Sequence, residues 1–147
     1  MQTFLPIANF KRSLQCLDYR RLGKQRVETF QLLCALDYKP ALLERFIRGL
    51  PPHGHGWANH PACKMWKGHE HALADYFNQS INEWIKRGFN NTMKTLLVPV
   101  EHSYPDWFGD VQFHNSHKSN LLRKNPEYYS TFNWNVKSDL EYIWPAQ

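Results

Sequence analysis

The sequence predicts an all-α fold, a compact single-domain helical bundle with long connecting loops. Three observations favour this class. Apolar residues recur at helical spacing through two long stretches, helix start and stop signals flank these stretches, and only residues 90–100 have a strand-like or irregular pattern. The chain has 147 residues, enough for one domain with its own apolar core. We therefore expect one domain over 1–147, built from three to four main helices.

The first helical stretch covers residues 10–36, with a break or a new N-cap at Asp18. In the second half of this stretch, apolar side chains share one side of the helix. They are Leu22, Val27, Phe30, Leu33 and Cys34. Four polar side chains fall on the opposite side, namely Arg21, Lys24, Gln25 and Glu28. This pattern is typical of a helix with one face in the core.

A short helix over 41–48 and a loop over 50–59 follow. The next predicted helix is long, because Asn59 can cap it, Pro61 suits its first turn, and a Lys-Arg-Gly stop closes it at 86–88.

Toward the C-terminus, the sequence predicts a short basic helix over 116–124 and another helix over 126–132. Residues 134–147 read as an aromatic-rich tail that lies over the body of the domain.

Composition favours a polyanionic partner and an intracellular, reducing compartment. The formal net charge is +5 and the sequence pI is about 9.2. The three cysteines form no CxxC pair, so buried thiols are expected rather than a disulfide scaffold. No apolar run is long enough to span a bilayer, and the first residues do not resemble a signal peptide. We therefore expect a cytoplasmic protein that does not bind membranes.

A cationic strip over 18–28 is the first candidate site. Arg20, Arg21, Lys24 and Arg26 supply its positive charges, and Glu28 is the carboxylate near its end. Such a strip suits DNA phosphates, although a solvated helix face with a weak ion pair to Glu28 would have the same pattern. Arg26 falls within the apolar sector, so it needs a partner or a cleft.

Gly23 lies inside the same predicted helix, at a cost of about 1 kcal/mol relative to alanine. A close approach by another backbone, or by DNA, would explain a glycine at this position.

A histidine-rich segment is the second candidate site. His53, His55, His60, His69 and His71 lie close together in sequence. Their spacing matches no standard zinc site, so we expect no metal there. Instead, His60 should lie at a helix N-terminus, where backbone N–H groups favour a phosphate.

Residues 113–129 form the third candidate site. This segment combines two histidines with three cations, namely His114, His117, Lys118, Arg123 and Lys124. A clamp on the DNA backbone, followed by a tyrosine stacking platform, is one interpretation. An ordinary amphipathic helix with a solvated basic face is the other. No Gly-rich phosphate loop or serine nucleophile motif occurs, and no cofactor is expected.

In their shared order, these segments resemble the pyrimidine-dimer DNA glycosylase family, also called endonuclease V. The first matching positions are Asp18, Leu22, Arg26 and Glu28, followed by Gly56, His60 and Pro61. The end of the long helix at 85–90 also fits. The late matching positions are Gly109, Asp110, His114, Ser116, Leu122, Lys124, Pro126, Tyr128 and Tyr129.

The resemblance implies an all-α enzyme that cuts the N-glycosyl bond of a damaged pyrimidine and then the backbone at the abasic site. In this family an α-amine forms a Schiff base with C1′, and a glutamate, matched by Glu28, handles the sugar and proton transfers. Cationic side chains hold kinked DNA, and a base turns out of the stack. The matching clamp positions are Arg26, His60, Arg123 and Lys124.

Two positions depart from the family pattern. Residue 2 is Gln, and its large side chain should block removal of Met1, so the amine would be that of Met1 unless Lys24 substitutes for it. Val27 stands where many members have a cation directly before the glutamate.

The sequence therefore predicts a DNA-repair glycosylase, with AP-lyase activity as the finer expectation, that acts as a monomer on damaged pyrimidines in duplex DNA. Glu28 and Met1 are the expected catalytic residues. The expected DNA-binding residues are Arg20, Arg21, Lys24, Arg26, His60, His114, His117, Lys118, Arg123 and Lys124. Two alternatives stay open: a non-catalytic nucleic-acid-binding module, and a metal-dependent nuclease using residues 53–71.

Overall fold

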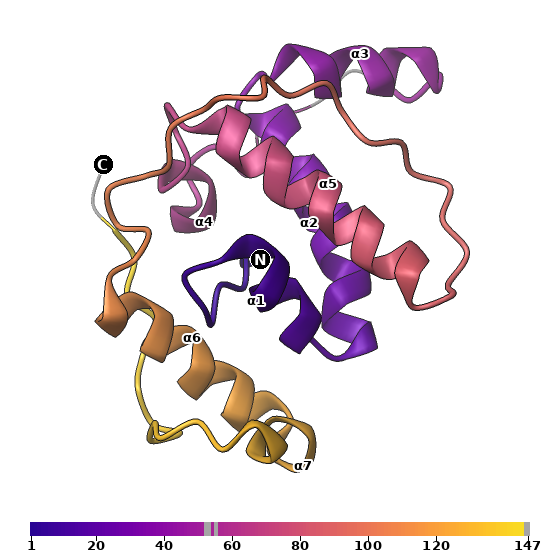
Figure 1. Cartoon of the computed structure of the whole chain (residues 1–147). Coiled ribbons are helices and arrows are strands. Elements are labelled where there is room, and N and C mark those ends of the chain that lie inside the picture. Colours follow the sequence, from indigo (N-terminus) through magenta and orange to yellow (C-terminus); the bar gives the residue numbers. More distant parts are fainter. Residues whose placement is uncertain (52–53, 55, 146–147) are drawn as a thin grey trace.

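A computed structural model of the chain describes residues 1–51, 54 and 56–145 (Figure 1). Over these residues the chain forms helices and connections without strands, which confirms the all-α prediction. The helices are α1 (Phe10–Cys16), α2 (Tyr19–Ala35), α3 (Lys39–Ile47), α4 (Pro61–Lys64), α5 (Glu70–Lys86), α6 (Val111–Lys124), α7 (Pro126–Tyr129) and the 3₁₀ helix η1 (Ser130–Phe132). No described helix has the length and apolar character needed to cross a membrane.

The long helices α2 and α5 pack against each other, and α1 packs on α5 (Figure 1). The predicted break before α2 is confirmed, since Asp18 occupies the N-cap position of this helix. Its carboxylate does not cap the helix. It instead accepts hydrogen bonds from Arg21, at 3.2 Å, and from the buried hydroxyl of Tyr129. Asp18 thereby fastens the start of α2 to α7.

The wheel assignment of α2 is wrong at two positions. Gln25, expected on the polar side, is 1% exposed, whereas Val27, expected in the core, is 46% exposed. The reason is that the N-terminal segment, and not only α5, packs against this helix, so the buried sector is displaced toward Gln25.

The predicted long helix after residue 59 is divided into α4 and α5. Gly68 has a φ of +87°, a conformation that ends the first turn of helix and that L-residues rarely adopt. Trp66, just before this turn, is fully buried and fixes the position of the break in the core. The N-cap of α4 is His60, not Asn59, and its Nδ1 accepts the Ala62 N–H at 3.0 Å.

The C-terminal third differs from the prediction mainly in helix length. α6 begins at residue 111, earlier than expected, because Asp110 caps it by accepting the Gln112 N–H at 3.0 Å. Residues 134–145 form the predicted tail, which runs back along α6 (Figure 1). Its backbone is held there by hydrogen bonds to Ser119 and Asn120.

Residues 1–5 run in an extended conformation through the interior of the molecule (Figure 1). Residues 2–5 are buried, although no strand of the described chain pairs with them. A buried backbone must satisfy its N–H and C=O groups. Here side chains from α2, α5 and α6 take the place of a neighbouring strand. The indole of Trp66 adds a hydrogen bond to the Thr3 hydroxyl at 3.0 Å.

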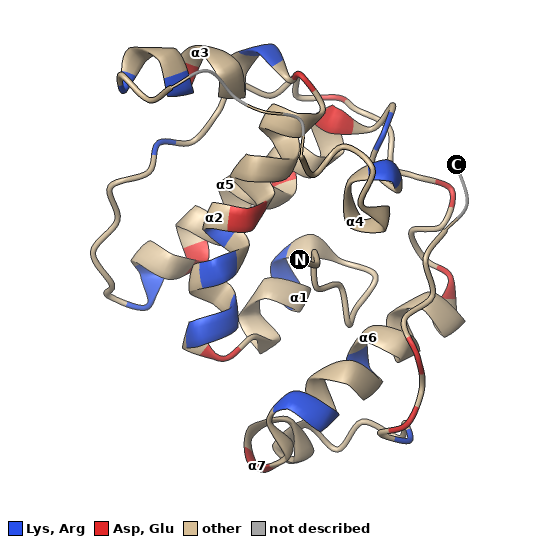
Figure 2. Ribbon diagram, turned by 180° about the vertical axis from the view of Figure 1, so that it is seen from behind, with Lys and Arg blue, Asp and Glu red and all other residues tan. Residues whose placement is uncertain are grey.

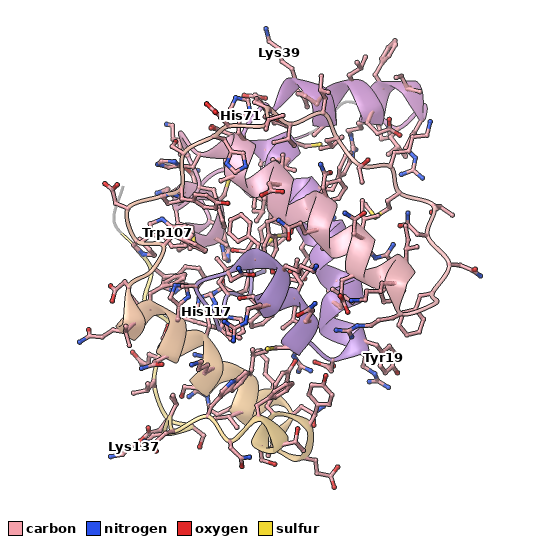
Figure 3. The ribbon with its side chains drawn as sticks, in the orientation of Figure 1. Tyr19, Lys39, His71, Trp107, His117 and Lys137 are labelled. Carbon is pink, nitrogen blue, oxygen red and sulfur yellow. The ribbon has the colours of Figure 1, made fainter. Side chains whose placement is uncertain are left out.

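His114 and His117 hold this segment from α6, and their predicted contact with DNA is wrong. His117 Nδ1 accepts the Leu5 N–H at 2.9 Å, and His114 Nδ1 lies 2.7 Å from the Leu5 carbonyl oxygen. His114 Nε2 accepts the Gly109 N–H at 3.0 Å. Figure 3 shows His117 on the inner side of α6. The two rings are 5% and 0% exposed, so neither can reach a phosphate.

Both histidines are neutral in the folded state. Each imidazole accepts a backbone N–H, which requires an unprotonated nitrogen. Burial lowers the pKa of both rings, and that of His117 falls to about 3. An exposed histidine has a pKa of about 6.5.

The stability of the fold should therefore fall as the pH falls from about 6.5 toward 3, because the unfolded chain gains a proton at His117 that the folded chain excludes. At pH 5, His117 alone should reduce the free energy of unfolding by about 2 kcal/mol relative to pH 7.5. Urea titrations at the two pH values measure this difference.

His117→Phe is the control, since a phenyl ring can pack against Phe113 but does not titrate. This variant should be less stable at pH 7.5. At acid pH, the number of protons that it takes up on unfolding should be smaller by close to one. An equal pH dependence in both proteins would show that His117 is not the titrating group.

Candidate active site

A cleft of about 950 Å³ opens beside the first turns of α2. It is lined by Met1, Gln2, Phe4, Asp18, Tyr19, Arg20, Arg21, Lys24, Glu28, Arg87, Lys124, Asn125, Tyr128 and Tyr142. Its walls therefore come from the N-terminal segment, α2, the C-cap of α5, the α6–α7 junction and the tail. The basic strip predicted from sequence forms one of these walls.

The two predicted catalytic residues, Met1 and Glu28, line the same cleft. The adjoining backbone nitrogen, that of Gln2, donates to Glu28 Oε2 at 3.4 Å. Met1 and Glu28 are each half-buried, so both remain accessible from the cleft. The N-terminal residue and the carboxylate of Glu28 thus belong to the lining of one cleft.

Positive charge surrounds this carboxylate. Of the predicted DNA-binding residues, Arg20, Arg21, Lys24 and Lys124 line the cleft. Figure 2 shows cationic bands on the first turns of α2 and on the last turn of α6, with the N-terminus between these helices. Two walls of the cleft can therefore attract a polyanion from opposite sides.

Arg26 interacts with an aromatic ring and an amide rather than with an acidic side chain. Its guanidinium lies 4.1 Å from the ring centroid of Trp84 and donates to Asn91 Oδ1 at 2.9 Å. Partial burial lowers its pKa. Arg26 does not line the cleft and so stabilises the junction between α2 and the segment after α5.

The Trp84 ring also explains why residue 23 is a glycine. A Cβ at this glycine would lie 3.2 Å and 3.3 Å from two carbons of the indole ring. The close approach expected at Gly23 is therefore made by a side chain of α5 rather than by a backbone or DNA. The same ring forms part of a second, shallower hollow of about 500 Å³ on the other side of Lys24 and Glu28.

His60 lies at the N-terminus of α4, as predicted, between the rings of Trp57 and Trp144. Burial, and then the positive charge of the α-amine, lower the pKa of His60, whereas the charge of Glu28 raises it. His60 does not itself line the cleft of Met1 and Glu28.

Two predicted phosphate ligands are engaged elsewhere. The Arg123 guanidinium donates to the Ser138 carbonyl oxygen at 2.6 Å and to Asn120, so it fastens the tail to α6. The Lys118 ammonium lies 5.9 Å from the Trp134 ring centroid. Neither residue lines the cleft, because the tail covers this part of α6.

Sequence reasoning missed several residues of the site. The sequence marks Arg87 only as part of a helix stop, yet this residue lines the cleft. Its guanidinium pairs with Glu83 at 2.8 Å and donates to the Leu14 carbonyl oxygen at 3.1 Å. Tyr142 reaches the cleft from the tail, and no local motif marks it.

The histidine-rich segment shows no metal site in the part that the structure describes. His53 and His55 lie outside the described residues. Among the others, no group of three or more His, Cys, Asp or Glu side chains could hold a metal ion. His71 Nδ1 lies 3.1 Å from the hydroxyl of Tyr38.

Comparisons with known proteins identify the family. No curated protein and no solved structure matches the chain. A family model described as pyrimidine dimer DNA glycosylase matches residues 1–97, which include the N-terminal segment and helices α1 to α5. The match therefore contains Met1, Glu28 and the cationic wall of α2, whereas α6, α7 and the tail lie beyond it. On this evidence the chain belongs to the pyrimidine dimer DNA glycosylase family.

Proposed function

We propose that this protein releases damaged pyrimidines from duplex DNA and then cleaves the backbone as an AP lyase. The α-amine of Met1 is the nucleophile, and Glu28 is the acid and base. The observation that carries this proposal is the position of both residues in one basic cleft, where the Gln2 backbone nitrogen lies 3.4 Å from Glu28 Oε2.

The chemistry divides between these two groups. The neutral amine attacks C1′ of the sugar, and the C1′–N bond breaks as the base leaves with the bonding electron pair and takes up a proton. Opening of the C1′–O4′ bond then forms a Schiff base and places a proton on O4′, which Glu28 can supply. Removal of a proton from C2′ finally expels the 3′ phosphate by breaking the C3′–O bond.

Duplex DNA fits the charge distribution. Arg20 and Lys24 project from α2, and Lys124 projects from the end of α6, so the cleft has cations on two walls. A phosphate backbone that follows both walls would bring the sugar to the amine and the carboxylate between them. The part-buried position of Glu28 in a concave site favours this enzyme over a non-catalytic DNA-binding module.

Borohydride trapping tests the nucleophile. Incubation with an abasic duplex or a duplex that carries a pyrimidine dimer should give a covalent adduct after reduction, and peptide mapping should locate it on the α-amine of Met1. An intact mass of the purified protein establishes whether Met1 is retained. An adduct on Lys24, which lines the same cleft, would assign the lyase step to that residue. Absence of any adduct and of base release would overturn the proposal.

Replacement of the carboxylate tests Glu28. Glu28→Gln should lower the rate of base release by about 10²- to 10⁴-fold, the usual contribution of a positioned acid or base. Glu44→Gln on α3 is the matched control and should leave the rate unchanged. EDTA should affect neither protein, whereas its inhibition of the wild type would favour a metal-dependent nuclease.

The salt dependence of DNA binding tests the two cationic walls. Lys24→Ala and Lys124→Ala should each reduce the slope of log K against log salt concentration by about 1, because each removes one phosphate contact. Lys39→Ala is the control, since Lys39 lies at the opposite end of the molecule from Tyr19 (Figure 3). Fluorescence anisotropy at several salt concentrations measures the slopes. An equal change in all three variants would indicate only a general effect of net charge.

A further inference from the structure

Gln25 is a buried polar side chain next to the candidate active site. It lies on α2, three residues before Glu28, and is 1% exposed. Side chains three apart on a helix are neighbours on its surface. A buried amide at this position is costly unless its hydrogen bonds are made, so its partners indicate its role.

All of those partners belong to the N-terminal segment or to Tyr76. Gln25 Nε2 donates to the Gln2 carbonyl oxygen at 2.8 Å, and Oε1 accepts the Phe4 N–H at 3.0 Å. The Tyr76 hydroxyl, from α5, lies 2.7 Å from Gln25 Oε1 and 2.8 Å from the Phe4 carbonyl oxygen. One side-chain amide thus pairs with the extended backbone as a neighbouring strand would.

The same turn of α2 also contacts the start of the segment through Glu28, whose Oε2 accepts the Gln2 N–H. The N–H and C=O groups of residue 2 are therefore both bonded to side chains that stand one helical turn apart. The backbone of residue 2, which directly follows the residue that carries the α-amine, is thereby tied to the helix that carries Glu28.

We propose that Gln25, supported by Tyr76, is the positioning residue that holds the Met1 α-amine in place relative to Glu28. This inference rests on the proposed function. Gln25 touches neither DNA nor the reacting atoms. It acts through the backbone of residues 2–4, and its loss should allow the amine to move while the cleft stays intact.

The chain offers a matched control in Asn78. Its side-chain amide also clamps an extended segment, since Nδ2 donates to the Leu96 carbonyl oxygen at 2.8 Å and Oδ1 accepts the Leu96 N–H at 2.7 Å. This clamp joins α5 to the crossover over 90–100 and does not line the cleft. Asn78→Leu therefore removes two similar hydrogen bonds without affecting the N-terminal segment.

The test compares Gln25→Met with Asn78→Leu in single-turnover trapping on an abasic duplex. Gln25→Met should lower the maximal trapping rate by about 30-fold or more, because small displacements of a reacting group are costly. The DNA concentration that gives half of this rate should change less than about twofold, a weak effect on affinity. Asn78→Leu should lower the thermal midpoint but leave the trapping rate unchanged. A wild-type rate in Gln25→Met, or an equal loss in both variants, would overturn the inference.

A chemical probe separates this inference from the proposed function. The rate of reductive methylation of the Met1 α-amine by formaldehyde and cyanoborohydride, measured against pH, depends on the surroundings of the amine and not on catalysis. Gln25→Met should change this profile, and Asn78→Leu should not. If the wild type fails to trap DNA, the proposed function fails, and the methylation profiles still decide the role of Gln25.

Tyr76→Phe provides a milder change if Gln25→Met folds poorly. It removes only the hydroxyl and keeps the buried ring. The maximal trapping rate should fall by about fivefold, roughly the effect of one hydrogen bond. The double variant should lose less than the product of the two single losses, because both side chains act on the same segment. Fully multiplicative losses would show that Tyr76 and Gln25 act independently.

Discussion

The pairing of the extended N-terminal segment with the side chains around it is the constraint on which the rest of this structure depends. A buried backbone without a neighbouring strand must find donors and acceptors elsewhere. Gln25 of α2 supplies both for residues 2 and 4, while His114 and His117 of α6 supply them for residue 5. The segment therefore connects the α2–α5 pair to α6, and the chain begins at the edge of the cleft.

This arrangement accounts for several of the polar side chains in the core. Gln25, Thr3, His114 and His117 are all buried. Gln25, His114 and His117 bond to the backbone of the N-terminal segment, and Thr3, within this segment, accepts a hydrogen bond from Trp66. Such networks are stabilising only when their members are satisfied, which makes the fold sensitive to protonation of the histidines. Polar side chains thus take the place of some apolar packing in the core, and they hold the N-terminal segment in a defined position.

Some residues that line the cleft belong to the part of the chain that the family model matches, and others lie beyond it. Met1, Glu28 and the cations of α2 belong to the region that the family model matches, and this region holds the proposed chemistry. The opposite wall, with Lys124 and Tyr128, comes from residues beyond the match. Tyr129 joins the two walls by bonding to Asp18 at the start of α2. The cleft therefore joins a wall from the region that the family model matches to a wall from the residues that follow it.

The sequence by itself determined the helical class, the start of α2 at Asp18, the basic strip and Glu28 as its carboxylate, because these features depend on local periodicity, caps and charge. Only the tertiary structure decided the rest. The sequence predicts that His114 and His117 contact DNA, yet a segment more than a hundred residues away buries them. Gln25 and Val27 exchange their expected environments for the same reason. A helical wheel shows which side chains share a face, but the partners of that face come from distant parts of the chain, and here one of those partners is the N-terminus itself.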